Sequence, residues 1–101
     1  MFNPSAGSKV LSESLPGNEL ITAGLRDLHE GRETIEALLV AVGAPRLRHL
    51  GLELPDKLPD NPEHRLYALL AESDSDSAHS RYNALIRRLV SFERAATCVN
   101  Q

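Results

Sequence analysis

Four histidines are the side chains of this sequence that could most readily ligate a metal or act as a catalytic base. They are His29, His49, His64 and His79. Asp76 and His79 form the one carboxylate-to-histidine pair three residues apart, whereas a di-iron bundle needs two Glu-x-x-His motifs and further glutamates. Glu30, Glu33 and Glu36 recur every third residue, which fits a solvated acidic helix face better than a cation site. The sequence therefore predicts no metal and no cofactor.

Nucleophilic catalysis would need a serine or cysteine with a nearby histidine, and no local signature connects such residues here. The six glycines stand singly, so they form no phosphate-binding loop. Cys98 is the single cysteine and cannot form an internal disulfide, which favours a reducing compartment and an inert thiol. We expect a protein that is not an enzyme.

Arginines gather near the C-terminus of a chain whose net charge is −3. Residues 78–101 contain four arginines and one glutamate, so the preceding residues carry a net charge of −6. An acidic protein is a poor general binder of nucleic acids, yet a local basic face could contact a polyanion. The candidate nucleic-acid contacts are Arg87, Arg94, Arg46 and Arg48.

The segment 32–50 also permits a helix-turn-helix interpretation, because Gly43 would lie in the turn and basic residues follow it. Gly51 and Pro55 end the second helix after about two turns, which is short for a recognition helix. We therefore favour a simple corner between two helices with solvated basic side chains.

Length and composition predict one folded domain of helices. The chain has 101 residues, 42% of them hydrophobic, 25% charged and only 4% aromatic. These are ordinary globular values, and an aliphatic core suits helices better than strands. The longest apolar run, ALLVAV at 37–42, is far shorter than a membrane span, and the N-terminal segment lacks the apolar stretch of a secretory signal. We expect a cytoplasmic protein without a membrane segment.

The chain divides into a flexible N-terminal arm at 1–16, rich in Ser, Gly and Pro, and a single helical domain at 17–101. Helical periodicity predicts helices at about 18–30, 32–42, 45–50, 62–73 and 77–98. Three prolines make 51–61 an extended connector. Asn18, Asn61 and the SDSDS segment at 73–77 are predicted to cap three of these helices.

The last helix carries a long apolar seam, whose members alternate at spacings of four and three residues. The seam consists of Ala78, Tyr82, Leu85, Leu89, Phe92, Ala96 and Val99, and Ile86 and Val90 widen it. Arg87 and Arg94 lie opposite, whereas Arg81 and Arg88 border the seam and could lay their methylene stems over it. We interpret this helix as held by its apolar side, with the basic side secondary.

Length decides what could cover this seam. A helix over 77–98 would run about 30 Å, whereas each of the other helices would run less than 20 Å. Either two short helices stack along the seam, or a second copy of the chain covers part of it. We favour the second alternative as a dimer, because a chain with a flexible arm and a long connector has few residues left for its core.

The sequence thus predicts an all-α fold, a small bundle of four to five helices with a long C-terminal helix. Its predicted function is that of a non-enzymatic protein-protein interaction or regulatory module that self-associates as a homo-oligomer. The expected interface residues are Tyr82, Leu85, Leu89 and Phe92, with Arg81 and Arg88 at the rim. The alternative is a nucleic-acid-binding regulator that uses Arg87, Arg94, Arg46 and Arg48.

Overall fold

The computed structural model describes residues 15–99, which form five helices and no strand. The helices are α1 (Asn18–His29), α2 (Ile35–Val42), α3 (Ala44–His49), α4 (Pro62–Ser73) and α5 (Ala78–Val99). The predicted all-α bundle with a long C-terminal helix is therefore confirmed. Residues 1–14, which make up most of the predicted arm, lie outside the described residues.

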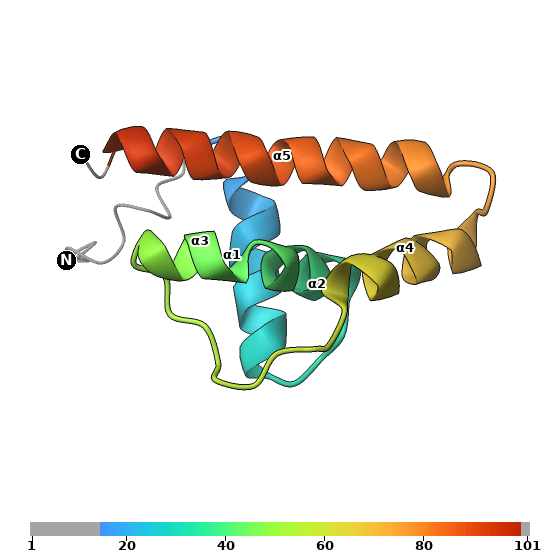
Figure 1. Cartoon of the computed structure of the whole chain (residues 1–101), viewed down its shortest axis with the longest axis horizontal. Helices are drawn as coiled ribbons and strands as arrows, with labels where there is room; N and C mark the ends of the chain where they lie inside the picture. Colours follow the sequence, from blue (N-terminus) through green and yellow to red (C-terminus); the bar gives the residue numbers. More distant parts are fainter. Residues whose placement is uncertain (1–14, 100–101) are drawn as a thin grey trace, which may run out of the picture.

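The short helix α2 is the centre of the bundle. It packs most extensively on α1 and α4, and it also contacts α3 and α5. Helices α2, α3 and α4 lie in one layer beneath α5, and α1 crosses them (Figure 1). The arrangement is elongated, with extents of 45 × 25 × 24 Å, because α5 spans the whole layer.

A glycine permits close contact between α1 and α2. Gly24 is buried on α1, and a Cβ atom there would overlap the carbonyl oxygen of Glu36 and the Cγ2 atom of Val40 on α2. The backbones of α1 and α2 approach each other because no side chain separates them. Gly24 therefore allows α1 and α2 to pack closely.

Helix α2 begins at Ile35, three residues later than the predicted start at residue 32. Thr34 is its N-cap, and the Thr34 hydroxyl accepts a hydrogen bond of 3.1 Å from the Ala37 amide. The same hydroxyl donates to Oδ2 of the buried Asp27 at 2.7 Å, and the Arg32 guanidinium donates to Oδ1 at 3.3 Å. This network holds residues 32–34 in a turn against α1, so they cannot join the helix.

The predicted acidic helix face at Glu30, Glu33 and Glu36 is therefore wrong, because two of its members precede the helix. Glu30 pairs with Arg32 in the turn. Glu33 pairs with Arg65 of α4, where the Arg65 Nη2 atom lies 2.9 Å from Oε2. These carboxylates link neighbouring segments of the chain.

The predicted asparagine caps are also wrong in their chemistry. The residue before α1 is Gly17, with φ of 77°, and Asn18 is already helical; within residues 15–99, its Oδ1 atom is buried without a hydrogen-bond partner. Asn61 does precede α4, but its φ is 49° and its side chain makes no capping hydrogen bond. A side-chain cap favours extended backbone at the capping residue, and both of these starts are left-handed instead.

Ser73 of the SDSDS segment ends α4, and the other four residues, 74–77, form the turn before α5. Asp74 accepts a 3.1 Å hydrogen bond from the Asp76 amide, and the Ser77 hydroxyl donates to the Asp74 carbonyl oxygen at 3.4 Å. These side chains stabilise the reversal of the chain through local hydrogen bonds.

The predicted connector and the end of the predicted arm both contribute to the core. Leu52 is buried, and Leu54 and Leu58 pack against the core while half-exposed. Leu15 is also buried, and its carbonyl oxygen accepts a hydrogen bond from the Asn18 amide. Leu15 therefore belongs to the folded domain, because its side chain leaves water for an apolar environment.

Candidate interaction surfaces of the last helix

The apolar seam of α5 faces the rest of the chain. Ala78, Leu89, Phe92 and Ala96 are buried, and Tyr82 and Leu85 are half-buried against the core. Val99, the last member, is 42% exposed. The interpretation that the apolar side holds α5 is confirmed for the buried members, while the arginines of this helix are all exposed.

Several short elements of the same chain cover the seam. Helix α4 packs on α5, and α2 contacts it as well. At Gly43, which follows α2, a Cβ atom would come within 2.9 Å of a Leu89 methyl group, and a Cβ at Gly17 would lie 3.6 Å from the Phe92 Cβ. The folded chain therefore realises the first of the two alternatives, stacked short elements along a long helix.

Leu89 and Phe92, two of the four predicted interface residues, lie inside this core with exposed fractions of 4% and 0%. Their side chains are occupied by intramolecular packing, so a folded monomer cannot offer them to a partner. Tyr82 and Leu85 remain partly accessible. Self-association through α5 stays a prediction, and it needs a different set of side chains.

A partly exposed group of apolar side chains lies beside the seam. The sequence pattern had predicted its α5 members Ile86 and Val90 only as a widening of the seam. Tyr67 of α4 and Val90 of α5 are each 37% exposed, and Ile86 is half-buried between the core and the surface. On a helical wheel Tyr82, Ile86 and Val90 advance by 40° per step, so they share one side of α5. We call Tyr67, Tyr82, Ile86 and Val90 the aromatic flank.

Ring contacts join the two helices at one end of the aromatic flank. The Tyr67 ring lies 5.6 Å from the Tyr82 ring and 6.5 Å from the His79 ring, in tilted geometry. Burial raises the pKa of Tyr82, and the nearby Glu63 carboxylate raises it further. Tyr82 therefore keeps a neutral hydroxyl, which can form hydrogen bonds across an interface.

The arginines of α5 differ in what they contact. Arg81 donates from Nη1 to the Ser73 hydroxyl at 3.0 Å, so it helps to join α4 and α5. Arg87 and Arg88 instead line a shallow hollow with Pro16, Gly17, Ala84 and Ser91.

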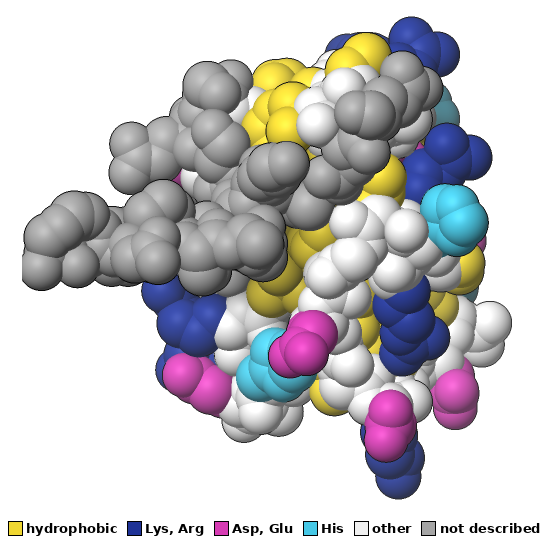
Figure 2. All heavy atoms as spheres, turned by 90° about the vertical axis from the view of Figure 1, so that its left-hand side faces the viewer, with side chains coloured by type: hydrophobic (Ala, Val, Ile, Leu, Met, Phe, Trp, Pro, Cys, Tyr) yellow, Lys and Arg dark blue, Asp and Glu magenta, His cyan; other side chains and the backbone are white. Residues whose placement is uncertain are grey.

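The four residues predicted to contact nucleic acid lie in two groups. Arg46 and Arg48 belong to α3, where Arg46 lies 4.0 Å from the Glu93 carboxylate and Arg48 donates to the Pro55 carbonyl oxygen at 2.9 Å. Arg87 and Arg94 project from α5 into solvent. At the end of the molecule where α3 and the last turns of α5 lie, basic side chains stand on both sides of a hydrophobic band (Figure 2). The four arginines are thus divided between α3 and α5 and do not form one continuous basic patch.

Glu93 is the one acidic side chain on α5, and the sequence analysis gave it no role. Its side chain is 12% exposed and lies against Gly43, at the junction of α2 and α3. Burial raises the pKa of Glu93, and the Arg46 guanidinium partly opposes this effect. The carboxyl therefore binds a proton more tightly in the folded chain than in water.

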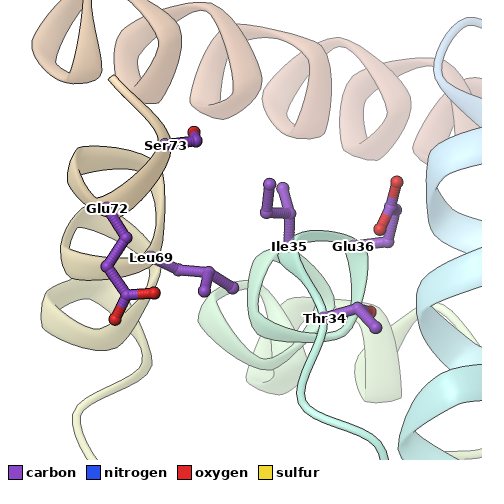
Figure 3. A pocket seen from close by; sticks show the side chains of 6 residues that line it. All are labelled: Thr34, Ile35, Glu36, Leu69, Glu72 and Ser73. Carbon is purple, nitrogen blue, oxygen red and sulfur yellow. The ribbon is translucent and has the colours of Figure 1, made fainter. Parts of the chain in front are cut away.

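A hollow of about 540 Å³ opens between the start of α2 and the end of α4. Leu69 extends from α4 toward α2, while Ile35 and Glu36 point toward α5 (Figure 3). Glu72, Ser73 and Thr34 complete the lining. The lining thus consists of two aliphatic side chains, two carboxylates and two hydroxyls.

The histidines and the cysteine do not converge. His29 contacts the Glu53 carbonyl oxygen through Nε2 at 3.0 Å, and the His79 ring lies 3.2 Å from the Asn83 amide nitrogen. Cys98 is exposed on α5. Within residues 15–99, no group of three or more His, Cys, Asp or Glu side chains is arranged to hold a metal ion. In the same part of the chain, no helix is both long and apolar enough to cross a membrane.

Comparison with known proteins adds no relative: no protein-family model, no curated protein and no solved structure matches this chain.

Proposed function

We propose that this protein is a non-enzymatic interaction or regulatory module that self-associates as a dimer through the aromatic flank. A location in the cytoplasm is favoured, because the single cysteine cannot form an internal disulfide and suits a reducing compartment. The proposed interface lies on α5, as predicted from the sequence. It uses the accessible side chains beside Leu89 and Phe92, because those two residues are buried.

One observation carries the proposal. The exposed large hydrophobic side chains of residues 15–99 are Tyr67, Val90 and Val99, and two of these three lie on the aromatic flank. Ile86 and Tyr82 join them into a continuous strip across α4 and α5. A contiguous apolar strip with aromatic side chains is typical of a protein interface, whereas scattered apolar residues are not.

Light scattering coupled to size-exclusion chromatography tests this proposal. The wild-type chain is expected to elute with twice the mass of one chain. Val90→Asp is expected to weaken the dimer by about 100-fold, because the interface would bury an unpaired carboxylate. Ser91→Asp is the matched control, since it adds the same charge to the next exposed position of α5, 100° away.

Both variants should retain the helical circular dichroism of the wild type, because positions 90 and 91 are exposed. A monomeric wild-type chain at high micromolar concentration would refute the proposal. If Val90→Asp and Ser91→Asp weakened the dimer equally, the interface would not be centred on the aromatic flank.

A second candidate function is nucleic-acid binding, favoured by the exposure of Arg87 and Arg94 on α5. Binding of a labelled duplex should then weaken steeply with salt, because released counterions drive such complexes. Arg48→Glu combined with Arg87→Glu should abolish it and leave the oligomeric state unchanged. Arg26→Glu combined with Lys57→Glu is the control at exposed positions elsewhere. Absence of binding to a duplex at low salt would end this candidate.

A further inference from the structure

A second surface lies on the side of α4 turned away from the aromatic flank. It is the hollow between the start of α2 and the end of α4, which we call the α2–α4 hollow. Leu69 in its lining comes two residues after Tyr67, so the two side chains point about 200° apart around α4. A partner that covers the aromatic flank need not cover this hollow, so a ligand of the hollow is independent of the proposed self-association.

The two hydroxyl groups of the α2–α4 hollow already have partners within the chain. The Thr34 hydroxyl accepts from a backbone amide of α2 and donates to the Asp27 carboxylate. The Ser73 hydroxyl donates to the Leu70 carbonyl oxygen at 3.1 Å and accepts from Arg81 at 3.0 Å. The groups of the lining that remain for a ligand are the two aliphatic side chains and the two carboxylates.

Glu36 differs from the other acids of residues 15–99, because it is partly buried without a cation. Three of these acids are buried or half-buried, namely Asp27, Glu36 and Glu93. Arg32 pairs with Asp27, and Arg46 lies 4.0 Å from the Glu93 carboxylate. Glu36 forms no ion pair in this part of the chain, and it lies in the first turn of α2, where the helix dipole favours a negative charge. A cation that enters the hollow would therefore compensate for the water that this carboxylate has lost.

The two carboxylates lie on opposite sides of the aliphatic pair. In Figure 3 the side chains of Leu69 and Ile35 stand between those of Glu72 on α4 and Glu36 on α2. Arg81 contacts the hydroxyl of the lining on α4, and it forms no ion pair with either carboxylate within the described residues. A ligand that matches this surface has an aliphatic group between two cations.

We infer that the α2–α4 hollow docks a basic amphipathic segment of a partner protein. An aliphatic side chain of this segment packs on Ile35 and Leu69, and an arginine or lysine lies beside each of the two carboxylates. The hollow has about 540 Å³ and is open to solvent, so it would cover only part of a free small molecule, whereas ligand pockets bury most of their ligand. A polyanion is disfavoured, because the unpaired charges of the lining are negative. This surface gives the module a second partner besides another copy of the chain.

Titration of the isotope-labelled full chain with a synthetic amphipathic peptide tests this docking site. The probe repeats arginine, leucine and alanine at helical spacing, and two control peptides replace either its arginines by glutamate or its leucines by serine. Nuclear magnetic resonance should show shifts of the amides of residues 34–36 and 69–73 with the probe and no shifts with either control. Both kinds of group are needed, because a surface ion pair or a small apolar contact alone contributes little free energy. An unchanged spectrum with the probe, or equal binding of the serine peptide, would overturn the inference.

Neutral variants locate the ion pairs. Glu36→Gln is expected to weaken binding of the probe about tenfold, because a hydrogen bond to a partly buried charge is stronger than one at the surface. Glu72→Gln should weaken it about threefold, since residue 72 is exposed. Glu53→Gln is the matched control, which removes an exposed charge outside the hollow and should leave the affinity unchanged. Equal losses in all three variants would mean that the net charge of the chain, and not the hollow, attracts the peptide.

The same variants separate two other occupants. If spermidine displaced the probe at equal concentration, the occupant would be a small polycation and not a protein segment. If Glu36→Gln changed the mass measured by light scattering, a second copy of the chain would occupy the hollow. Either result would refute the inferred partner. A monomeric wild-type chain that still binds the probe at this hollow would refute the aromatic-flank dimer and leave the docking site intact.

Discussion

Helices α2 and α5 are held in the fold in different ways. Helix α2 has eight residues, and five consecutive ones, Ala37 to Ala41, are buried because α1, α4, α3 and α5 surround it. Helix α5 has 22 residues, of which four are buried, all on the seam that faces the chain. The shorter helix organises the core, and the longer one offers most of its surface to solvent.

Because of this difference, we expect substitutions on α2 to change the stability of the fold and substitutions on the outer side of α5 to change binding to a partner. The five buried residues of α2 follow one another in the sequence, so they contact the core on all sides of the helix and substitutions there act on folding. A residue on the outer side of α5 contacts only water in one chain, so substitutions there act on whatever partner covers it. The aromatic flank lies at the boundary, with Tyr82 and Ile86 partly in the core and Val90 exposed.

Truncation of α2 should give the largest loss of stability. Leu39 is 0% exposed, and Leu39→Ala is expected to lower the free energy of unfolding by about 2 to 5 kcal/mol, through lost burial and the cavity left behind. Val90→Ala on α5 should cost less than about 0.5 kcal/mol in the monomer. Urea unfolding measured at a concentration where the chain is monomeric checks both values. Equal losses in the free energy of unfolding for the two variants would contradict the proposed difference between α2 and α5.

Loss of the α2 cap should have an intermediate effect. Thr34→Ala removes the acceptor of the Ala37 amide and leaves Oδ2 of the buried Asp27 without its hydroxyl donor. We expect a loss of about 1 to 2 kcal/mol in the free energy of unfolding. Thr34→Ser should retain most of the stability, because the hydroxyl remains. A similar loss in both variants would mean that the methyl group of Thr34, rather than its hydroxyl, matters.

The smallest effect concerns the contact of α5 with the junction of α2 and α3. Burial raises the pKa of Glu93 above its ordinary value of 4.5, so the folded chain binds this proton more tightly than the unfolded chain. The resulting stabilisation is fully present below pH 4.5 and is lost as the pH rises through the raised pKa. Glu93→Gln should remove this part of the pH dependence. A difference in unfolding free energy between wild type and Glu93→Gln that stays constant across this range would contradict the assignment.

Helix positions could be predicted from the sequence, because apolar periodicity and single glycines and prolines act locally. The predicted ranges 45–50 and 62–73 agree closely with α3 and α4, and the last helix shifts by one residue at each end. The starts of α1 and α4 agree with the predicted residues 18 and 62, although left-handed backbone at Gly17 and Asn61, and not a side-chain cap, precedes them. The start of α2 was predicted three residues too early, because the turn before it is held by Asp27 and Arg32.

The candidate interface shows the same division. Periodicity correctly marked one side of α5 as apolar, but it could not say which part of that side the chain would cover. Leu89 and Phe92 are buried because Gly43 and Gly17 allow backbone from other segments to approach them. Val90 is exposed because no helix of residues 15–99 packs over it. Tyr67 joins the flank from α4, which no pattern within α5 could show.

The sequence by itself determined the helical class, the approximate positions of the helices and the apolar side of the last one. Those properties depend on contacts within a few residues, which spacing records directly. Only the tertiary structure decided that α2 is the central helix, that short elements cover the seam, and that Tyr67 and Val90 stay exposed beside the half-buried Ile86. These features depend on how close separate helices can approach, and that distance is set by residues far apart in the sequence, such as Gly24 and Val40.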